Sequence, residues 1–184
     1  LTVRLTQPSK TMILIIVFEG RVSRTVRVQH LPFILFHQDL KNDDLDDPDD
    51  LDDRKLVGLL GLGFNRLSIG FQSLDDSLLK LLDRRHTATT AISAFRKAID
   101  AGFVNTSIDL IYGLPKQTLE IWMETLGRVC ELNPPHLSMY CLTVEHGTPL
   151  KRDIAMGSLP DPDPDLAADM YLSAEELMNR HGLL

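Results

Sequence analysis

Apolar residues fall into short runs separated by amphipathic stretches, which is typical of strands alternating with helices. Residues 64–72 and 104–111 are mostly apolar and end in polar or turn-forming residues, so each predicts a short β-strand. Between them, residues 75–82 predict a short helix, and Thr87 or Thr89 can cap a second one. The second helix repeats apolar residues at helical spacing, namely Ile92, Phe95 and Ile99, and ends at Gly102. The pattern predicts a βαβ unit, whose ligands would lie just past the carboxyl ends of the strands.

The same alternation continues toward the carboxyl end. Thr118 can cap a helix that stops before Pro134, and Trp122 on that helix is expected to be a packing residue. Residues 136–144 predict a third strand, and residues 166–180 predict a further helix. A shorter helix is expected at residues 54–60, before the first strand of the βαβ unit.

The amino-terminal part is of a different kind. Residues 12–18 and 31–36 are rich in β-branched and aromatic side chains, which predicts two buried strands, but residues 1–38 as a whole are unassigned. Residues 39–53 are a run of aspartates that lacks the glycine and terminal glutamate of an EF-hand, so a solvated acidic linker is favoured over a calcium loop. Residues 54–184 would then form the core domain.

Composition limits the class of protein. The 184 residues carry a net charge of −7, which argues against a nucleic-acid or anionic-membrane surface, since both need a basic footprint. The most apolar run, residues 11–18, is too short to span a bilayer, and no targeting segment is recognised. Cys130 and Cys141 fit neither a disulfide framework nor a metal knuckle, so a reducing cytoplasm is the expected setting.

Three ordered motifs resemble a known family. Residues 64–73 read FNRLSIGFQS, residues 84–87 read RRHT, and residues 109–118 read DLIYGLPKQT. Together they resemble the coproporphyrinogen-III-oxidase-like branch of the radical S-adenosylmethionine (SAM) enzymes. Within that branch, residues 136–149, HLSMYCLTVEHGTP, are more similar to the HemW-type heme chaperones.

The resemblance implies an α/β fold, a partial (β/α) radical-SAM barrel of the TIM type, and SAM as a ligand. It assigns Gln72 to the ribose hydroxyls, Arg84 to the methionine carboxylate, Asp109 to the ribose and Ile111 to the adenine. Residue chemistry alone leaves alternatives open. Gln72 could be a turn residue, Arg84 could complement a helix dipole, Arg85 could replace it, and Asp109 could pair with Arg66.

Other residues with reactive side chains have simpler interpretations. His86 is interpreted as an ordered turn histidine, Tyr112 as a packed tyrosine and Cys141 as a buried thiol, because nothing in the sequence pairs them. Gly113 either lets the backbone approach a ligand or makes a turn.

Two functions follow from the resemblance, and both carry a condition. Family members use a 4Fe–4S cluster on a Cys-x-x-x-Cys-x-x-Cys loop, which these 184 residues lack, so enzyme activity is left open. The first hypothesis is a HemW-type chaperone that binds heme or porphyrin and passes heme to an accepting protein. The alternatives are an oxygen-independent coproporphyrinogen III oxidase and an inactive fragment.

A partial barrel also carries a physical expectation. Its outer strands would leave backbone groups unpaired, and apolar residues facing the barrel interior would lack a covering layer. The residues expected there are Leu67, Ile69, Ile108 and Leu110. Self-association of the chain is therefore expected.

Overall fold

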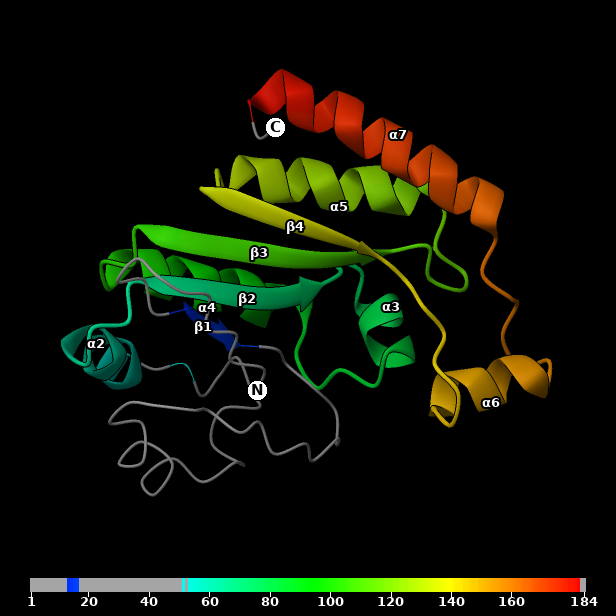
Figure 1. The fold of residues 1–184 in the computed structure, drawn as a ribbon, viewed down its shortest axis with the longest axis horizontal. Coiled ribbons are helices and arrows are strands. Elements are labelled where there is room, and N and C mark those ends of the chain that lie inside the picture. Colours follow the sequence, from blue (N-terminus) through cyan, green and yellow to red (C-terminus); the bar gives the residue numbers. More distant parts are fainter. Residues whose placement is uncertain (1–12, 17–50, 52, 183–184) are drawn as a thin grey trace.

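The computed structural model describes residues 13–16, for which only the backbone is considered, residue 51, and residues 53–182. Its centre is a fully parallel sheet of four strands in the order β1-β2-β3-β4 (Figure 1). The strands are β1 (Ile13–Ile16), β2 (Arg66–Gln72), β3 (Asn105–Tyr112) and β4 (His136–Cys141). Parallel neighbouring strands joined by helices are the arrangement of an α/β barrel wall, so the predicted fold class is confirmed.

The helices cover one face of this sheet and its two ends. They are α2 (Asp53–Gly61), α3 (Asp76–Leu81), α4 (Ala88–Asp100), α5 (Leu119–Glu131), α6 (Pro149–Ala155) and α7 (Pro164–His181). In Figure 1, α4 lies behind the sheet, α5 runs beside β4, and α7 lies on the outer side of α5. The carboxyl end of β2 lies beside α3, so this is the end of the sheet where a ligand would be held.

Side-chain caps begin the helices where the sequence predicts. The Thr87 hydroxyl accepts a hydrogen bond from the Thr90 amide at 3.2 Å, which selects Thr87 over Thr89 as the cap of α4. The Thr118 hydroxyl accepts from the Ile121 amide at 3.3 Å and begins α5. Each cap satisfies an amide that has no partner inside its helix.

One of the two apolar amino-terminal runs joins the sheet. Residues 13–16 form β1, which pairs in parallel with β2 and so covers the β2 edge. The strand predicted at 31–36 and nearly all of the acidic linker predicted at 39–53 lie outside the described residues. Of that linker, Leu51 is buried and Asp53 is the first residue of α2.

The apolar face of the sheet is turned toward the helices, which corrects the expectation for Leu67, Ile69, Ile108 and Leu110. All four are fully buried in the same cluster as residues of α4 and α5. Phe71, on the same face, makes an edge-to-face ring contact with Phe95 of α4, with the ring centroids 6.3 Å apart. These residues therefore have a covering layer, and they give no reason to expect self-association.

Helix α4 packs against the sheet mainly through alanines. Its buried residues are Ala88, Ala91, Ala94, Phe95 and Ala98, whereas Ile99, one of the apolar residues at helical spacing, is 42% exposed. These positions recur at helical spacing and form the face of α4 that packs on the sheet, and Ile99 lies outside that face.

Gly113 provides a test of how closely α7 packs on the sheet. It has a φ of +74°, and an added Cβ would lie 3.3 Å from Ala167 Cβ and 3.6 Å from Cys141 Sγ. We expect Gly113→Ala to lower the free energy of unfolding by about 1–3 kcal/mol, because both the backbone angle and the space oppose it. Urea denaturation followed by circular dichroism measures the change.

Gly127 is the matched control for that substitution. It lies inside α5 with nothing within 4 Å of an added Cβ. Gly127→Ala should raise the free energy of unfolding by about 0.5–1 kcal/mol, because alanine favours helix. Equal effects of the two substitutions would contradict the tight packing at Gly113.

Candidate functional site

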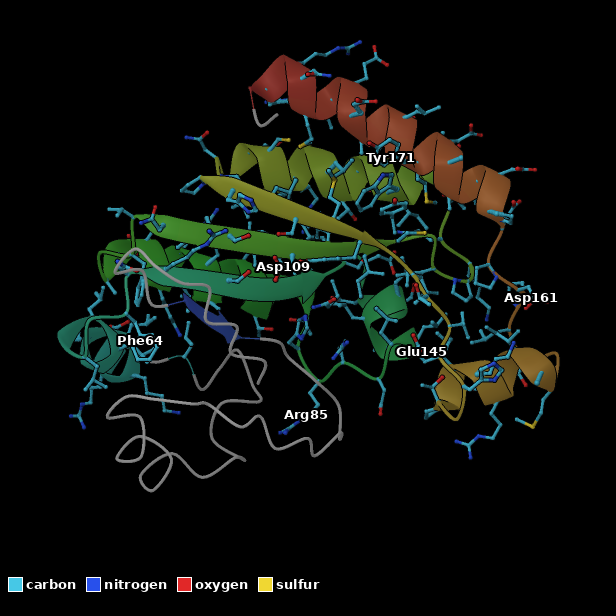
Figure 2. The ribbon with its side chains drawn as sticks, in the orientation of Figure 1. Phe64, Arg85, Asp109, Glu145, Asp161 and Tyr171 are labelled. Carbon is cyan, nitrogen blue, oxygen red and sulfur yellow. The ribbon has the colours of Figure 1, made fainter. Side chains whose placement is uncertain are left out.

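The sheet face opposite the helices carries a row of polar residues. Strand alternation places Ser68 and Gly70 of β2 on this face, level with Ser107 and Asp109 of β3. Figure 2 shows Asp109 on the side of the sheet away from α4. In a closed barrel this face would be the interior.

Asp109 is 8% exposed, and its carboxylate is held by two hydroxyls. Ser68 Oγ donates to its Oδ2 at 2.8 Å, and Ser107 Oγ lies 3.4 Å from its Oδ1. These serines, rather than Arg66, are its hydrogen-bond partners within the described residues. A carboxylate has room for about four hydrogen bonds, so further acceptor positions are left for a ligand.

Gln72 is the last residue of β2, one register position beyond the level of Asp109 on β3. A bulge after Gly70 makes Leu110, the residue after Asp109, the pairing partner of Gln72. Gln72 has a φ of +63° and is 5% exposed. Its side-chain amide makes no hydrogen bond to any described residue. A left-handed, buried glutamine is costly, and such strain is concentrated at ligand sites.

His86 contacts the backbone at the same end of β2. Its Nε2 lies 3.2 Å from the carbonyl oxygen of Phe71, the residue before Gln72. The side chain is buried and contacts the backbone of β2, in addition to lying in the turn predicted from sequence. It ties the segment after α3 to the end of β2.

Two adjacent arginines follow α3, and their exposure differs. Arg84 is half-buried, and its backbone amide donates to Leu79 at 2.9 Å, whereas Arg85 is exposed. Asp83, between the helix and Arg84, has a φ of +55°, which turns the chain back toward the sheet. Burial therefore favours Arg84 over Arg85 as the residue next to a ligand at this rim.

The loop between β3 and α5 is a closed turn. Gln117 Oε1 accepts from the Leu114 backbone amide at 3.1 Å, and the Gln117 backbone amide donates to the Leu114 carbonyl at 3.0 Å. Gln117 is buried, and both Gly113 and Lys116 have positive φ. These bonds hold the rim in one shape without a ligand, with Ile111 half-buried on the same strand face as Asp109.

Tyr112 and Cys141 are neighbours, although the sequence did not pair them. They are Cα partners at the ends of β3 and β4, and burial, followed by the nearby Cys141, raises the pKa of Tyr112. The Tyr112 ring packs against Trp122, with the ring centroids 5.5 Å apart. Cys141 is exposed, so its interpretation as a buried thiol was wrong.

The cysteines do not fit an iron–sulfur cluster. Such a cluster in this family needs three thiolates on one loop, and the chain contains only Cys130, in α5, and Cys141, at the end of β4. Burial raises the pKa of Cys130, which disfavours the thiolate that a metal requires. Within residues 13–16, 51 and 53–182, no three His, Cys, Asp or Glu side chains are grouped to hold a metal ion.

Sequence reasoning missed Ser68, Ser107 and Gln117. The serines alternate with apolar residues along their strands, and this period of two was the available signal for a polar face. Gln117 gave no signal, because its hydrogen bond to Leu114 exists only after the turn has formed.

Comparison with known proteins gives consistent matches. The family model of the Radical SAM superfamily matches residues 42–129. Radical S-adenosyl methionine domain-containing protein 1, mitochondrial, of Mus musculus is 42% identical over 128 residues, covering 70% of this chain and 29% of that protein. Heme chaperone HemW of Bacillus subtilis (strain 168) is 37% identical over 136 residues, covering 74% of this chain and 36% of HemW.

A solved structure matches as well. Coproporphyrinogen III oxidase (HemN) from Escherichia coli, described as a radical SAM enzyme, superposes with a TM-score of 0.65 at 34% identity, covering 74% of this chain and 31% of HemN. The parallel sheet, the polar inner face and these matches define a radical SAM protein. More narrowly, the chain belongs to the HemN- and HemW-like group of that superfamily. It spans about a third of the length of the relatives named here.

Proposed function

We propose that this chain holds the adenosine and methionine parts of SAM at the carboxyl end of its sheet. The observation that carries the proposal is the pairing of Gln72 with the residue after Asp109. In support, Gln72 is 5% exposed and its side chain has no described hydrogen-bond partner, while Asp109, at the same end of the sheet, has acceptor capacity left. Two adjacent ribose hydroxyls need such a combination of donor and acceptor.

Each residue has a separate task in this proposal. Asp109 accepts hydrogen bonds from the ribose hydroxyls, and Gln72 donates to and accepts from the same sugar. Arg84 offers its planar guanidinium to the methionine carboxylate, and Ile111 packs against the adenine. The closed turn at Gly113 to Gln117 holds the rim in position, so little conformational entropy is lost on binding.

In the family, the chemistry that a bound 4Fe–4S cluster would supply is reductive cleavage of SAM. The cysteines of this chain do not fit that cluster, so no step through it is assigned to these residues. In this proposal Gln72, Arg84, Asp109 and Ile111 bind the nucleoside, orient its ribose and exclude water from it.

For the whole protein we propose heme binding and transfer of the HemW type. Residues 136–149 resemble the chaperone branch, and the bacterial relatives found are named heme chaperone HemW. The partners would be heme or porphyrin and a heme-accepting protein, in a reducing compartment such as the cytoplasm. No helix in the described part of the chain is long and apolar enough to cross a membrane.

Oxygen-independent coproporphyrinogen III oxidation is the second candidate, supported by the structural match to HemN. The two functions differ in the ligand that is retained. A Soret shift when the whole protein is titrated with heme, with no decarboxylation of coproporphyrinogen III, favours the chaperone. Decarboxylation of coproporphyrinogen III without a heme-induced Soret shift favours the oxidase.

The SAM proposal is tested by calorimetric titration of the purified chain with S-adenosyl-L-homocysteine, which needs no cluster. We expect saturable binding that Gln72→Ala weakens about tenfold, because one or two hydrogen bonds to the ribose are lost. Gln117→Ala removes the hydrogen bond that closes the rim but no proposed ligand contact. Lys97→Ala, on α4, is the control that should bind like the wild type. Absence of saturable binding by the wild-type chain would overturn the proposal.

A further inference from the structure

A hydrogen-bond chain leads from the amino end of β4 to the Asp109 carboxylate. His136 Nδ1 lies 2.9 Å from Ser107 Oγ, and Ser107 Oγ lies 3.4 Å from Asp109 Oδ1. Ser107 is almost fully buried, whereas His136, the first residue of β4, is exposed. The chain therefore connects an accessible imidazole to the proposed ribose acceptor.

Ser107 has a single proton to donate, and its hydroxyl has three polar neighbours. Besides His136 and Asp109, Ser138 Oγ lies 3.5 Å away. If His136 Nδ1 carries no proton, the shortest contact takes the Ser107 proton, and the Asp109 side of the chain is not formed. If His136 Nδ1 carries a proton, it donates to Ser107 Oγ, and the serine proton is left for Asp109.

We infer that His136 is a positioning residue of the SAM site, acting through Ser107 on the Asp109 carboxylate. Its Nδ1–H donates to Ser107 Oγ, and Ser107 in turn donates to Asp109 Oδ1. Ser68 donates to the other oxygen at 2.8 Å, so both carboxylate oxygens are held in place. The lone pairs that remain are directed to the ribose hydroxyls, and this inference rests on the proposed function.

The predicted consequence is a site whose affinity depends on a residue that does not touch the ligand. A carboxylate held at one oxygen can rotate about its terminal bond, and orienting it again on binding costs affinity. Removing the donor at residue 136 should therefore weaken nucleoside binding without altering the fold, because the side chain is exposed at the beginning of a strand.

A matched pair of substitutions separates hydrogen bonding from packing. His136→Asn keeps an N–H donor near the position of Nδ1, whereas His136→Leu keeps the bulk and removes the donor. We expect S-adenosyl-L-homocysteine to bind about five- to tenfold more weakly to His136→Leu and to Ser107→Ala, and within about twofold of wild type to His136→Asn. Ser138→Ala, which removes only the most distant neighbour of the Ser107 hydroxyl, should also bind within about twofold.

The proton on His136 is measured separately by ¹⁵N NMR of histidine-labelled chain, with the His136 signals assigned by their loss in His136→Leu. We expect Nδ1 to be the protonated nitrogen and to lose that character in Ser107→Ala. Unchanged affinity in both His136→Leu and Ser107→Ala, or an unprotonated Nδ1 in the wild type, would overturn the inference. Wild-type chain that fails to bind the nucleoside overturns the proposed function instead, while the NMR result still decides the hydrogen-bond chain.

Discussion

Replacing Trp122 with alanine is expected to lower the free energy of unfolding by about 3–5 kcal/mol. The side chain is fully buried among β3, α5 and α7, and its Nε1 donates to the Met170 carbonyl of α7 at 2.9 Å. The ring also packs against Tyr112. Alanine would leave a large cavity and remove the side-chain donor from α5 to the Met170 carbonyl, so α7 should loosen from α5. Urea denaturation monitored by far-ultraviolet circular dichroism measures the loss.

Two control variants separate the causes of that loss. Trp122→Phe retains an aromatic ring but lacks the donor, so it should lose less than Trp122→Ala. Glu124→Ala changes an exposed residue of the same helix and should stay within about 0.5 kcal/mol of wild type. A Trp122→Ala loss no larger than that of Glu124→Ala would show that stability does not depend on this side chain.

Substituting Asp109 with asparagine is expected to weaken binding of S-adenosyl-L-homocysteine about 10- to 100-fold, because hydrogen bonds to a charged acceptor contribute about 1.5–3 kcal/mol. Asparagine has nearly the same shape, so Ser68 and Ser107 can still contact the side chain. What changes is the charge and one acceptor oxygen. Calorimetric titration of the wild type and the variant in the same buffer gives the ratio.

The control for Asp109→Asn is Asp169→Asn, which makes the same change of charge on the exposed side of α7. It should bind the nucleoside as the wild type does. If Asp109→Asn binds equally well, the carboxylate does not contact the ribose, and its role is limited to its hydrogen bonds with the serines. Thermal denaturation of both variants shows whether any loss of binding comes from unfolding.

The sequence by itself determined the local structure of this protein. Apolar periodicity located β2, β3 and β4 to within a few residues, and threonine before a helical stretch located the starts of α4 and α5. These signals act over three or four residues, through caps, turns and side-chain alternation, so they can be read along the chain. Family motifs added Gln72, Arg84, Asp109 and Ile111 as candidates at strand and helix ends.

Tertiary structure decided which face of each strand meets the helices. Alternation along β2 and β3 defines two faces, but only the packing of α4 and α5 shows that Leu67 and Ile108 face the helices. The same packing assigns the opposite face to the serines and to Asp109. The contacts that orient the carboxylate join residues 41 and 29 positions apart, Ser68 to Asp109 and Ser107 to His136. No local signal carries such pairings, because they depend on the strand register, which is set when the sheet assembles.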